Sequence, residues 1–117
     1  MNELDEFGKI FINEVRDRSI EDVDMSISGT YRSKRAIELT QQFSSLDKNS
    51  KEFIKRIIPF AIDYCLNNFL EMFEEHEELL LGMEGKDLCK ISDGLSGELY
   101  TEDGWIQKYT TQRYEEN

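Results

Sequence analysis

Apolar residues are densest between Phe53 and Phe73, and this run constrains the fold more than any other part of the sequence. A helix over Lys51–Leu81 would carry these side chains on nearly its whole circumference. A helix that is apolar nearly all round is expected to be surrounded by neighbouring elements. The sequence therefore predicts a long central helix about which the rest of the chain packs.

Two features of this central helix follow from single residues. Asn49 or Ser50 can cap its start, because their side chains accept hydrogen bonds from free backbone N–H groups. Pro59 lies inside the helix, where its ring removes a backbone donor and clashes with the preceding turn at a cost of about 3 kcal/mol. We therefore expect a kink or a break near Ile58.

Three shorter helices are predicted before it. Apolar residues spaced by three and four indicate an amphipathic helix over about residues 3–18. A second helix begins at Ser19 and stops at Gly29, although residues 23–27 also alternate as a short strand would. A third short helix covers Ser33–Phe43. The N-terminal part of the chain is thus expected to be helical.

The last 30 residues leave two alternatives open. Before them, Gly82 and Gly85 bracket a turn, and within them Asp103-Gly104 is typical of a two-residue β-hairpin. Trp105 and the residues after it also fit a short helix that closes one end of the core. The predicted fold is therefore all-α, a single helical domain over residues 1–117 around a Pro-kinked helix, with an α+β fold carrying a C-terminal hairpin as the alternative.

Composition narrows the function classes. The chain has 117 residues, 38% hydrophobic, and a formal charge of -11 at pH 7. This balance suits one folded domain and disfavours nucleic-acid binding, which needs an excess of cations on some face. The start MNELDEFGKI does not resemble a secretory signal, and the apolar run contains charged residues that exclude a membrane span. We expect a cytoplasmic protein without membrane contact.

The charge is unevenly distributed. Residues 1–29 hold 3 basic and 8 acidic groups, residues 30–60 hold 7 and 3, and residues 61–117 hold 4 and 14. The basic middle and the acidic end oppose the dipole of the central helix, so helix stability does not account for them. We interpret the acidic run as a surface that binds a partner with a basic surface; its residues are Glu74, Glu75, Glu77 and Glu78.

A second candidate set lies on the central helix. Asp63, Asn67 and Glu71 are spaced by four and form one polar row. We interpret the row as an exposed stripe and as the second choice for partner binding. If it faced inward, burial would raise the pKa of its carboxyl groups and suit them to acid-base chemistry or cation binding.

The remaining reactive residues favour structural roles. His76 is the only histidine and is expected at the surface, with a metal site beside Glu75 or Glu78 as the alternative. Cys65 and Cys89 are far apart in sequence and are interpreted as reduced thiols in the core. The sequence predicts no catalytic residue, no metal ligand and no cofactor.

Three stretches resemble small acidic bacterial proteins that are themselves uncharacterised. They are FINEVRDRSIEDVD, IDYCLNNFLEMFEE and SDGLSGELYTEDGWIQKYT, about half of the chain. The resemblance implies a bacterial cytosolic accessory protein and transfers no site residue.

The hypothesis that follows is a non-enzymatic protein-binding module, such as an immunity or inhibitor protein that covers a basic surface of its partner. Acidic patches accelerate association with basic proteins and add specificity. One alternative is a small metal-dependent or acid-base enzyme using Asp63, Glu71, Glu75 and His76. The other is a structural homo-oligomer in which the long helix pairs with its copy.

Overall fold

The computed structural model describes residues 1–115 of the chain. Its N-terminal quarter is one continuous helical run of three parts: α1 (Glu3–Phe11), the π-helical segment η1 (Ile12–Asp17) and α2 (Arg18–Ser28). The predicted boundary at Ser19 is wrong, because the backbone remains helical on both sides of it. The alternative of a strand over residues 23–27 is also wrong, since these residues lie inside α2.

The ends of the next elements follow local signals. Gly29 ends α2 with φ +94°, a left-handed conformation that glycine adopts without steric cost. Ser33 caps α3 (Lys34–Ser44), its hydroxyl oxygen accepting from the N–H of Ala36 at 3.2 Å. The third predicted helix is therefore confirmed.

The long helix α4 spans Lys48–Glu75. Its cap is Asp47, whose Oδ1 accepts from the N–H of Ser50 at 2.7 Å, and not Asn49 or Ser50. The helix ends at Glu75, six residues before the predicted end at Leu81. The chain turns here so that Leu81 and the hairpin after it can pack against the core.

Pro59 is buried inside α4, and the helix does not break there. A proline at this position leaves the carbonyl oxygen of Lys55, four residues earlier, without its helical donor. The Nε of Arg113 donates to that oxygen at 2.9 Å. A side chain from the far end of the sequence thus supplies the donor that Pro59 lacks. Of the kink or break predicted near Ile58, the break does not occur.

The segment after α4 contains the only two strands within residues 1–115. β1 (Gly82–Met83) pairs antiparallel with β2 (Lys86–Asp87), and Glu84 and Gly85 between them both have positive φ, at 51° and 81°. Two central residues with positive φ are typical of a type I′ hairpin. The predicted turn lies here, and the fold remains predominantly helical.

Three short helices follow the hairpin: α5 (Leu88–Ile91), the 3₁₀-helix η2 (Ser96–Leu99) and α6 (Trp105–Tyr109). The hairpin considered at Asp103-Gly104 is wrong, because Gly104 is the residue that precedes α6. Of the two alternatives for this region, the closing helix is the correct one.

The hydrophobic core occupies one end of the molecule, which we call the core end. Its buried residues come from α1, η1, the second half of α4 and the short C-terminal elements: Phe11, Ile12, Leu66, Leu70, Leu88, Leu95, Leu99, Trp105 and Ile106. Trp105 is 1% exposed and packs so closely on Gly8 of α1 that no Cβ would fit there. The prediction that Trp105 closes the core is confirmed.

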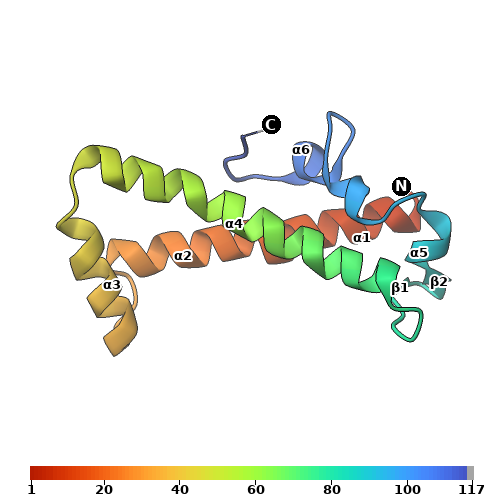
Figure 1. Cartoon of the computed structure of the whole chain (residues 1–117), viewed down its shortest axis with the longest axis horizontal. Helices are drawn as coiled ribbons and strands as arrows, with labels where there is room; N and C mark the ends of the chain where they lie inside the picture. The colour runs from red at the N-terminus through yellow and green to blue at the C-terminus, as the bar shows by residue number, and fades with distance from the viewer. Residues whose placement is uncertain (116–117) are drawn as a thin grey trace.

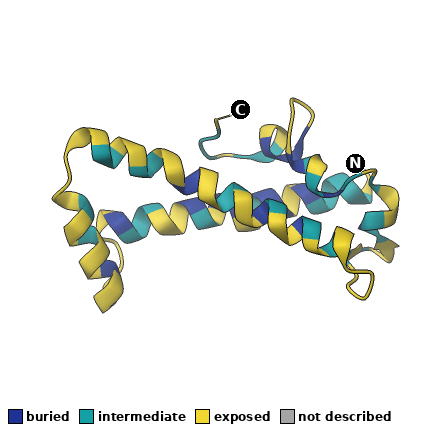
Figure 2. Cartoon of the chain, viewed as in Figure 1, coloured by how far each residue is buried: buried dark blue, intermediate teal, exposed yellow. Residues whose placement is uncertain are grey.

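The other end is thinner. We call α2, α3 and residues 48–60 of α4 the helical arm; apart from Pro59, its buried apolar residues are Ile20, Ile27, Ala36 and Ile58. Figure 1 shows α4 crossing the α1–α2 run, with α3 at the far end, and Figure 2 shows how much of this end is exposed. The radius of gyration is 16.6 Å, against about 13 Å expected for a compact chain of this length.

A C-terminal strap, residues 110–115, runs from α6 back toward the helical arm (Figure 1). No helix within residues 1–115 combines the length and the hydrophobicity that crossing a membrane requires. Both cysteines are free thiols, but Cys65 is exposed and Cys89 half-buried, so the predicted core location of Cys65 is wrong. Cys65 is exposed because it lies on a side of α4 that no other element covers.

Candidate functional site

The uncovered side of α4 is the most unusual surface of the described chain. Between residues 57 and 72, no exposed residue of α4 is charged. We call this surface the uncharged face; its residues are Ile57, Phe60, Ala61, Tyr64, Cys65, Asn68, Phe69 and Met72. Their spacing by three and four places them along one side of the helix.

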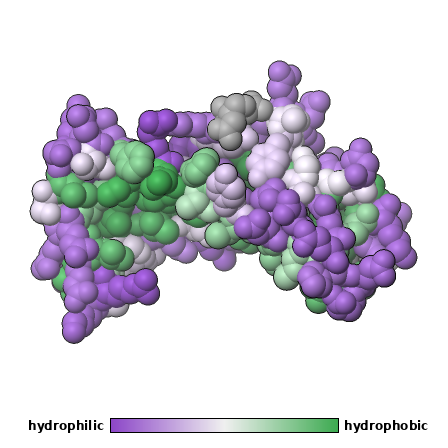
Figure 3. Space-filling view, in the orientation of Figure 1, coloured by the Kyte–Doolittle hydropathy of each residue, from purple (hydrophilic) through white to green (hydrophobic). Residues whose placement is uncertain are grey.

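Large apolar side chains dominate this face. Phe60 is 51% exposed and Tyr64 58%, and their rings meet edge to face with centroids 5.1 Å apart. Phe53 extends the apolar surface toward the start of α4 with 60% exposure. Figure 3 shows apolar surface gathered over the arm end of the molecule. Contiguous exposed apolar surface of this kind marks interaction sites in soluble proteins.

The earlier expectation for α4 is therefore corrected. A helix apolar nearly all round was predicted to be enclosed by neighbours, but the described elements cover only part of its circumference. The fold is too thin to enclose it, since the core forms at one end of the helix only.

A cavity of about 500 Å³ opens beside the uncharged face. Phe60 and Tyr64 belong to both, so the face and the cavity are continuous. The rest of the wall comes from α4, from the residues after η2 and from the C-terminal strap: Arg56, Pro59, Asp63, Asn67, Tyr100, Thr101, Arg113, Tyr114 and Glu115. Three tyrosines and a phenylalanine are among the residues that line this cavity.

The floor of this region is a buried ion pair. Arg16 in η1 is 0% exposed, and its guanidinium donates to both carboxylate oxygens of Asp63, at 2.6 and 3.2 Å. The same group donates to Oγ1 of Thr110 at 2.9 Å and to the carbonyl oxygen of Arg113 at 3.1 Å. Arg16 thus links the first helical run, α4 and the C-terminal strap.

Asp17 holds the strap from the neighbouring position. It accepts hydrogen bonds from the hydroxyl of Thr110 and from both the N–H and the hydroxyl of Thr111, at 2.5 to 3.1 Å. Asn13 donates to Asp17 and to the carbonyl oxygen of Tyr109. Asn13, Arg16 and Asp17 all lie in the π-helical segment η1. π-Helical turns are rare in proteins, and many of those that occur lie at functional sites. The strap is therefore attached to the most irregular part of the first helical run.

Each charged group that lines the cavity has an ion partner. Asp63 pairs with Arg16, and Arg56 with Glu115 at 2.9 and 3.0 Å. Arg113 donates to both carboxylate oxygens of Asp24 in α2, at 2.8 and 3.0 Å. A cavity without an unpaired charge favours uncharged and aromatic groups as occupants.

The pKa values of two half-buried carboxyl groups, Asp63 and Asp24, are shifted in opposite directions. Burial raises the pKa of Asp63, and the hydrogen bonds and charge of Arg16 only partly oppose this effect. The hydrogen bonds from Arg113 lower the pKa of Asp24, helped by the charges of Arg113 and Lys55. The strap is therefore held to the helical arm by an ionised carboxylate.

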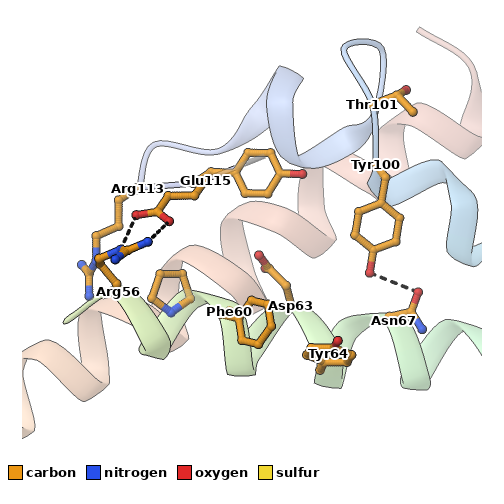
Figure 4. Close-up of a pocket in the computed structure, with 11 residues that line it drawn as sticks. Arg56, Phe60, Asp63, Tyr64, Asn67, Tyr100, Thr101, Arg113 and Glu115 are labelled. Atoms are coloured by element: carbon orange, nitrogen blue, oxygen red, sulfur yellow. Dashed lines mark hydrogen bonds and ion pairs between the residues drawn. The ribbon is translucent and has the colours of Figure 1, made fainter. Parts of the chain in front are cut away.

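The predicted polar row on α4 faces inward. Figure 4 shows Asp63 and Asn67 on α4 lining the cavity, with the hydroxyl of Tyr100 meeting Asn67. That hydroxyl donates to Oδ1 of Asn67 at 3.1 Å, and Glu71 is half-buried. The interpretation of the row as an exposed stripe is wrong, because the C-terminal strap and the residues around Tyr100 cover it.

The acidic run is divided by the end of α4. Glu74 accepts from the N–H of Ser96 and so takes part in the fold. Glu75 is the last residue of α4, and Glu77 and Glu78 follow in a turn, all three exposed. The dipole argument therefore applies to Glu74 and Glu75 only, since the other two lie outside the helix.

His76 is exposed, as predicted, and its Nδ1 lies 2.6 Å from Oε1 of Glu78. The residues considered for a metal or acid-base site do not form one cluster: Asp63 is bound to Arg16, whereas Glu75 and His76 lie at the exposed end of α4. Among residues 1–115, no group of three or more His, Cys, Asp or Glu side chains could hold a metal ion.

Sequence reasoning missed Arg16 and the uncharged face. Arg16 carries no motif, and its role depends on contacts with residues 47 to 97 positions away. The face had a signal, the uncharged residues at three and four spacing from Ile57 to Met72, but the same pattern also describes a buried helix. Comparison with known proteins adds no assignment: no family model matches the chain, and no curated protein or solved structure is significantly similar to it.

Proposed function

We propose that this chain is a non-enzymatic protein-binding module that docks an apolar-faced helix on the uncharged face of α4. The observation that carries the proposal is the absence of charge from every exposed α4 residue between positions 57 and 72, in a chain of net charge -11. Helix-in-groove recognition uses such anchors at three and four spacing.

The cavity beside Phe60 and Tyr64 supports the proposal. Binding energy concentrates where a large side chain enters a desolvated pocket, and aromatic residues are enriched there. Because the charged groups of the cavity wall are internally paired, an uncharged side chain of the partner helix can enter without leaving an ion unpaired.

The test uses a synthetic amphipathic helical peptide with leucines at three and four spacing as the probe. Titrated into isotope-labelled protein at concentrations where the chain is monomeric, it should shift NMR signals of Phe60 and Tyr64. Phe60→Glu should weaken binding at least tenfold. A helical peptide charged on all sides is the control, and equal binding of both peptides would contradict the proposal.

A second candidate is the inhibitor hypothesis, in which the acidic residues after Phe73 cover a basic partner surface. It is supported by Glu75 and Glu77, which are exposed and form no ion pair within the described chain. A basic partner that co-purifies in stoichiometric amount at low salt should be lost from a Glu75→Gln, Glu77→Gln, Glu78→Gln variant. Equal recovery by both proteins would reject this candidate.

We also propose a cytoplasmic location, which suits an exposed free thiol such as Cys65.

A further inference from the structure

We propose that the helix that covers the uncharged face is α4 of a second copy of this chain, in antiparallel orientation. The inference rests on the proposed function and identifies the partner. Three observations carry it: the symmetry of the face, the charge at the two ends of α4, and the elongated shape of the molecule.

The face is symmetric about the midpoint between Tyr64 and Cys65. Its eight positions form four pairs equidistant from that midpoint: Tyr64 with Cys65, Ala61 with Asn68, Phe60 with Phe69, and Ile57 with Met72. A twofold axis there would place every uncharged residue of one copy against an uncharged residue of the other. Such a self-complementary patch is what an isologous dimer requires.

The charges at the ends of α4 match in the same orientation. Its first nine residues carry four basic groups and one acidic group, Glu52. Lys55 and Arg56 pair with Asp24 and Glu115 of the same chain, which leaves Lys48 and Lys51 as the basic groups closest to the start of the helix. Its last five residues and the following turn carry only acidic charge, on Glu71, Glu74, Glu75, Glu77 and Glu78. Antiparallel pairing brings each basic end near an acidic end, whereas parallel pairing would bring like charges together.

This pairing also accounts for a charge arrangement that disfavours the isolated helix. Lys48 and Lys51 at the start of α4 and Glu74 and Glu75 at its end each oppose the helix dipole. Attraction between the ends of two antiparallel copies would offset this cost.

The shape of the monomer also favours a second copy of the chain as the element that covers the uncharged face. A radius of gyration of 16.6 Å reflects a helical arm that is two helical layers thick and exposes Phe53, Ile57 and Phe60. Residues 57 to 72 span about 22 Å of helix, long enough for a continuous helix-helix contact. A second copy laid along α4 would cover this surface without any change in fold.

Sedimentation equilibrium tests the proposal on the full chain. Wild type should show a concentration-dependent dimer, and Phe60→Glu should raise the dimer dissociation constant at least tenfold. The matched control is Ile10→Glu, because Ile10 is also 51% exposed but lies on α1, outside the face. Circular dichroism checks that both variants remain folded. A wild-type chain that stays monomeric at several hundred micromolar would overturn the proposal.

Charge reversal tests the orientation. The double variants Lys48→Glu, Lys51→Glu and Glu75→Lys, Glu77→Lys should each dimerise more weakly than wild type, and an equimolar mixture of the two should recover dimerisation. In a parallel pair, like ends would face each other before and after either reversal, so a variant that dimerises as tightly as wild type would overturn the antiparallel arrangement. A mixture as weak as either variant alone would overturn the attraction between oppositely charged ends.

Cys65 supplies an independent readout, since it lies next to the proposed axis. A short thiol-specific crosslinker should produce a covalent dimer from wild type and from Cys89→Ser, but not from Cys65→Ser. Crosslinking that persists in Cys65→Ser would contradict the proposed axis.

The peptide and the dimer experiments together separate the two proposals. If the chain stays monomeric but binds the amphipathic peptide, the proposed function stands and the self-pairing fails. If neither is observed, both fail.

Discussion

The core end and the helical arm share α4 but are stabilised differently. In its second half, Leu66 and Leu70 are 3% and 0% exposed and contact a cluster built from five other elements. In its first half, Phe53 and Ile57 are 60% and 42% exposed, and Ile58 is one of the few buried residues. The same helix is thus a core element at one end and a surface element at the other.

The difference shows how the thin end can be held in place. The helical arm lacks a large apolar cluster, and the C-terminal strap joins it to the rest through Arg16, Asp24 and the carbonyl of Lys55. Regions with few buried apolar contacts open at lower free energy than a core does. We therefore expect polar contacts to matter most at the arm and apolar packing at the core end.

The largest loss of stability is expected for Arg16→Met, which removes the hydrogen bonds that connect η1, α4 and the C-terminal strap. The substitution leaves the half-buried Asp63 carboxyl without its buried guanidinium partner, and removing one partner of such a pair costs about 3 to 5 kcal/mol. Urea denaturation of wild type and variant measures the loss.

Arg18→Met is the control for this substitution. Arg18 is exposed and pairs with Glu14 one turn away, a contact of about 0.2 to 0.5 kcal/mol. Equal losses from Arg16→Met and Arg18→Met would contradict the role assigned to the buried network.

The next largest effect on stability is expected from a pair of substitutions that compares the two halves of α4. Leu70→Ala should destabilise the fold by about 2 to 5 kcal/mol, because it empties a fully buried position. Ile57→Ala should change stability by less than about 0.5 kcal/mol, measured in dilute protein so that association does not contribute. Similar losses at both positions would show that Ile57 is enclosed and would remove the distinction between the two ends.

The smallest predicted effect concerns pH and the Asp24–Arg113 pair. Because the pKa of Asp24 is lowered in the folded chain, its stabilising contribution is complete above the ordinary pKa of an aspartate and is lost as the pH falls through the folded pKa. The difference in unfolding free energy between wild type and Asp24→Asn should therefore shrink from about pH 6 to about pH 3.

Asp63 contributes a pH dependence of stability with the opposite sign. Its pKa is raised by burial, so its protonation favours the folded chain as the pH falls and the benefit is lost as the pH rises. Asp63 is present in both wild type and Asp24→Asn, so its contribution cancels when the unfolding free energies of these two proteins are subtracted. The remaining pH dependence belongs to the Asp24–Arg113 pair. A difference that stays constant over the pH range would show that Asp24 contributes no ion pair.

Much of the local structure could be predicted from the sequence. The end of α2 at Gly29, the cap at Ser33 and the turn at Gly85 depend on neighbours within a few residues. Trp105 in the core followed from its size and from the helical spacing around it. Of the kink or break expected near Ile58, the break is absent because Arg113, 54 residues after Pro59, donates to the carbonyl oxygen of Lys55. Neighbours in the sequence could not indicate this contact.

The candidate site was predictable only in part. Spacing correctly placed Asp63 and Asn67 on one row of α4, but it could not show that the C-terminal strap covers that row. For the acidic run, the sequence identified the charges but not that Glu74 binds a backbone N–H and that α4 ends at Glu75.

The sequence by itself determined a mainly helical chain, some of the helix ends and the uneven distribution of charge, because these depend on spacing and on nearby residues. The tertiary structure alone decided which side of α4 is buried, which carboxylate meets Arg16, and that an uncharged face remains uncovered. A periodic pattern gives the direction of an apolar face but not its neighbours, and burial, ion pairing and exposed surface all depend on which distant segments arrive there.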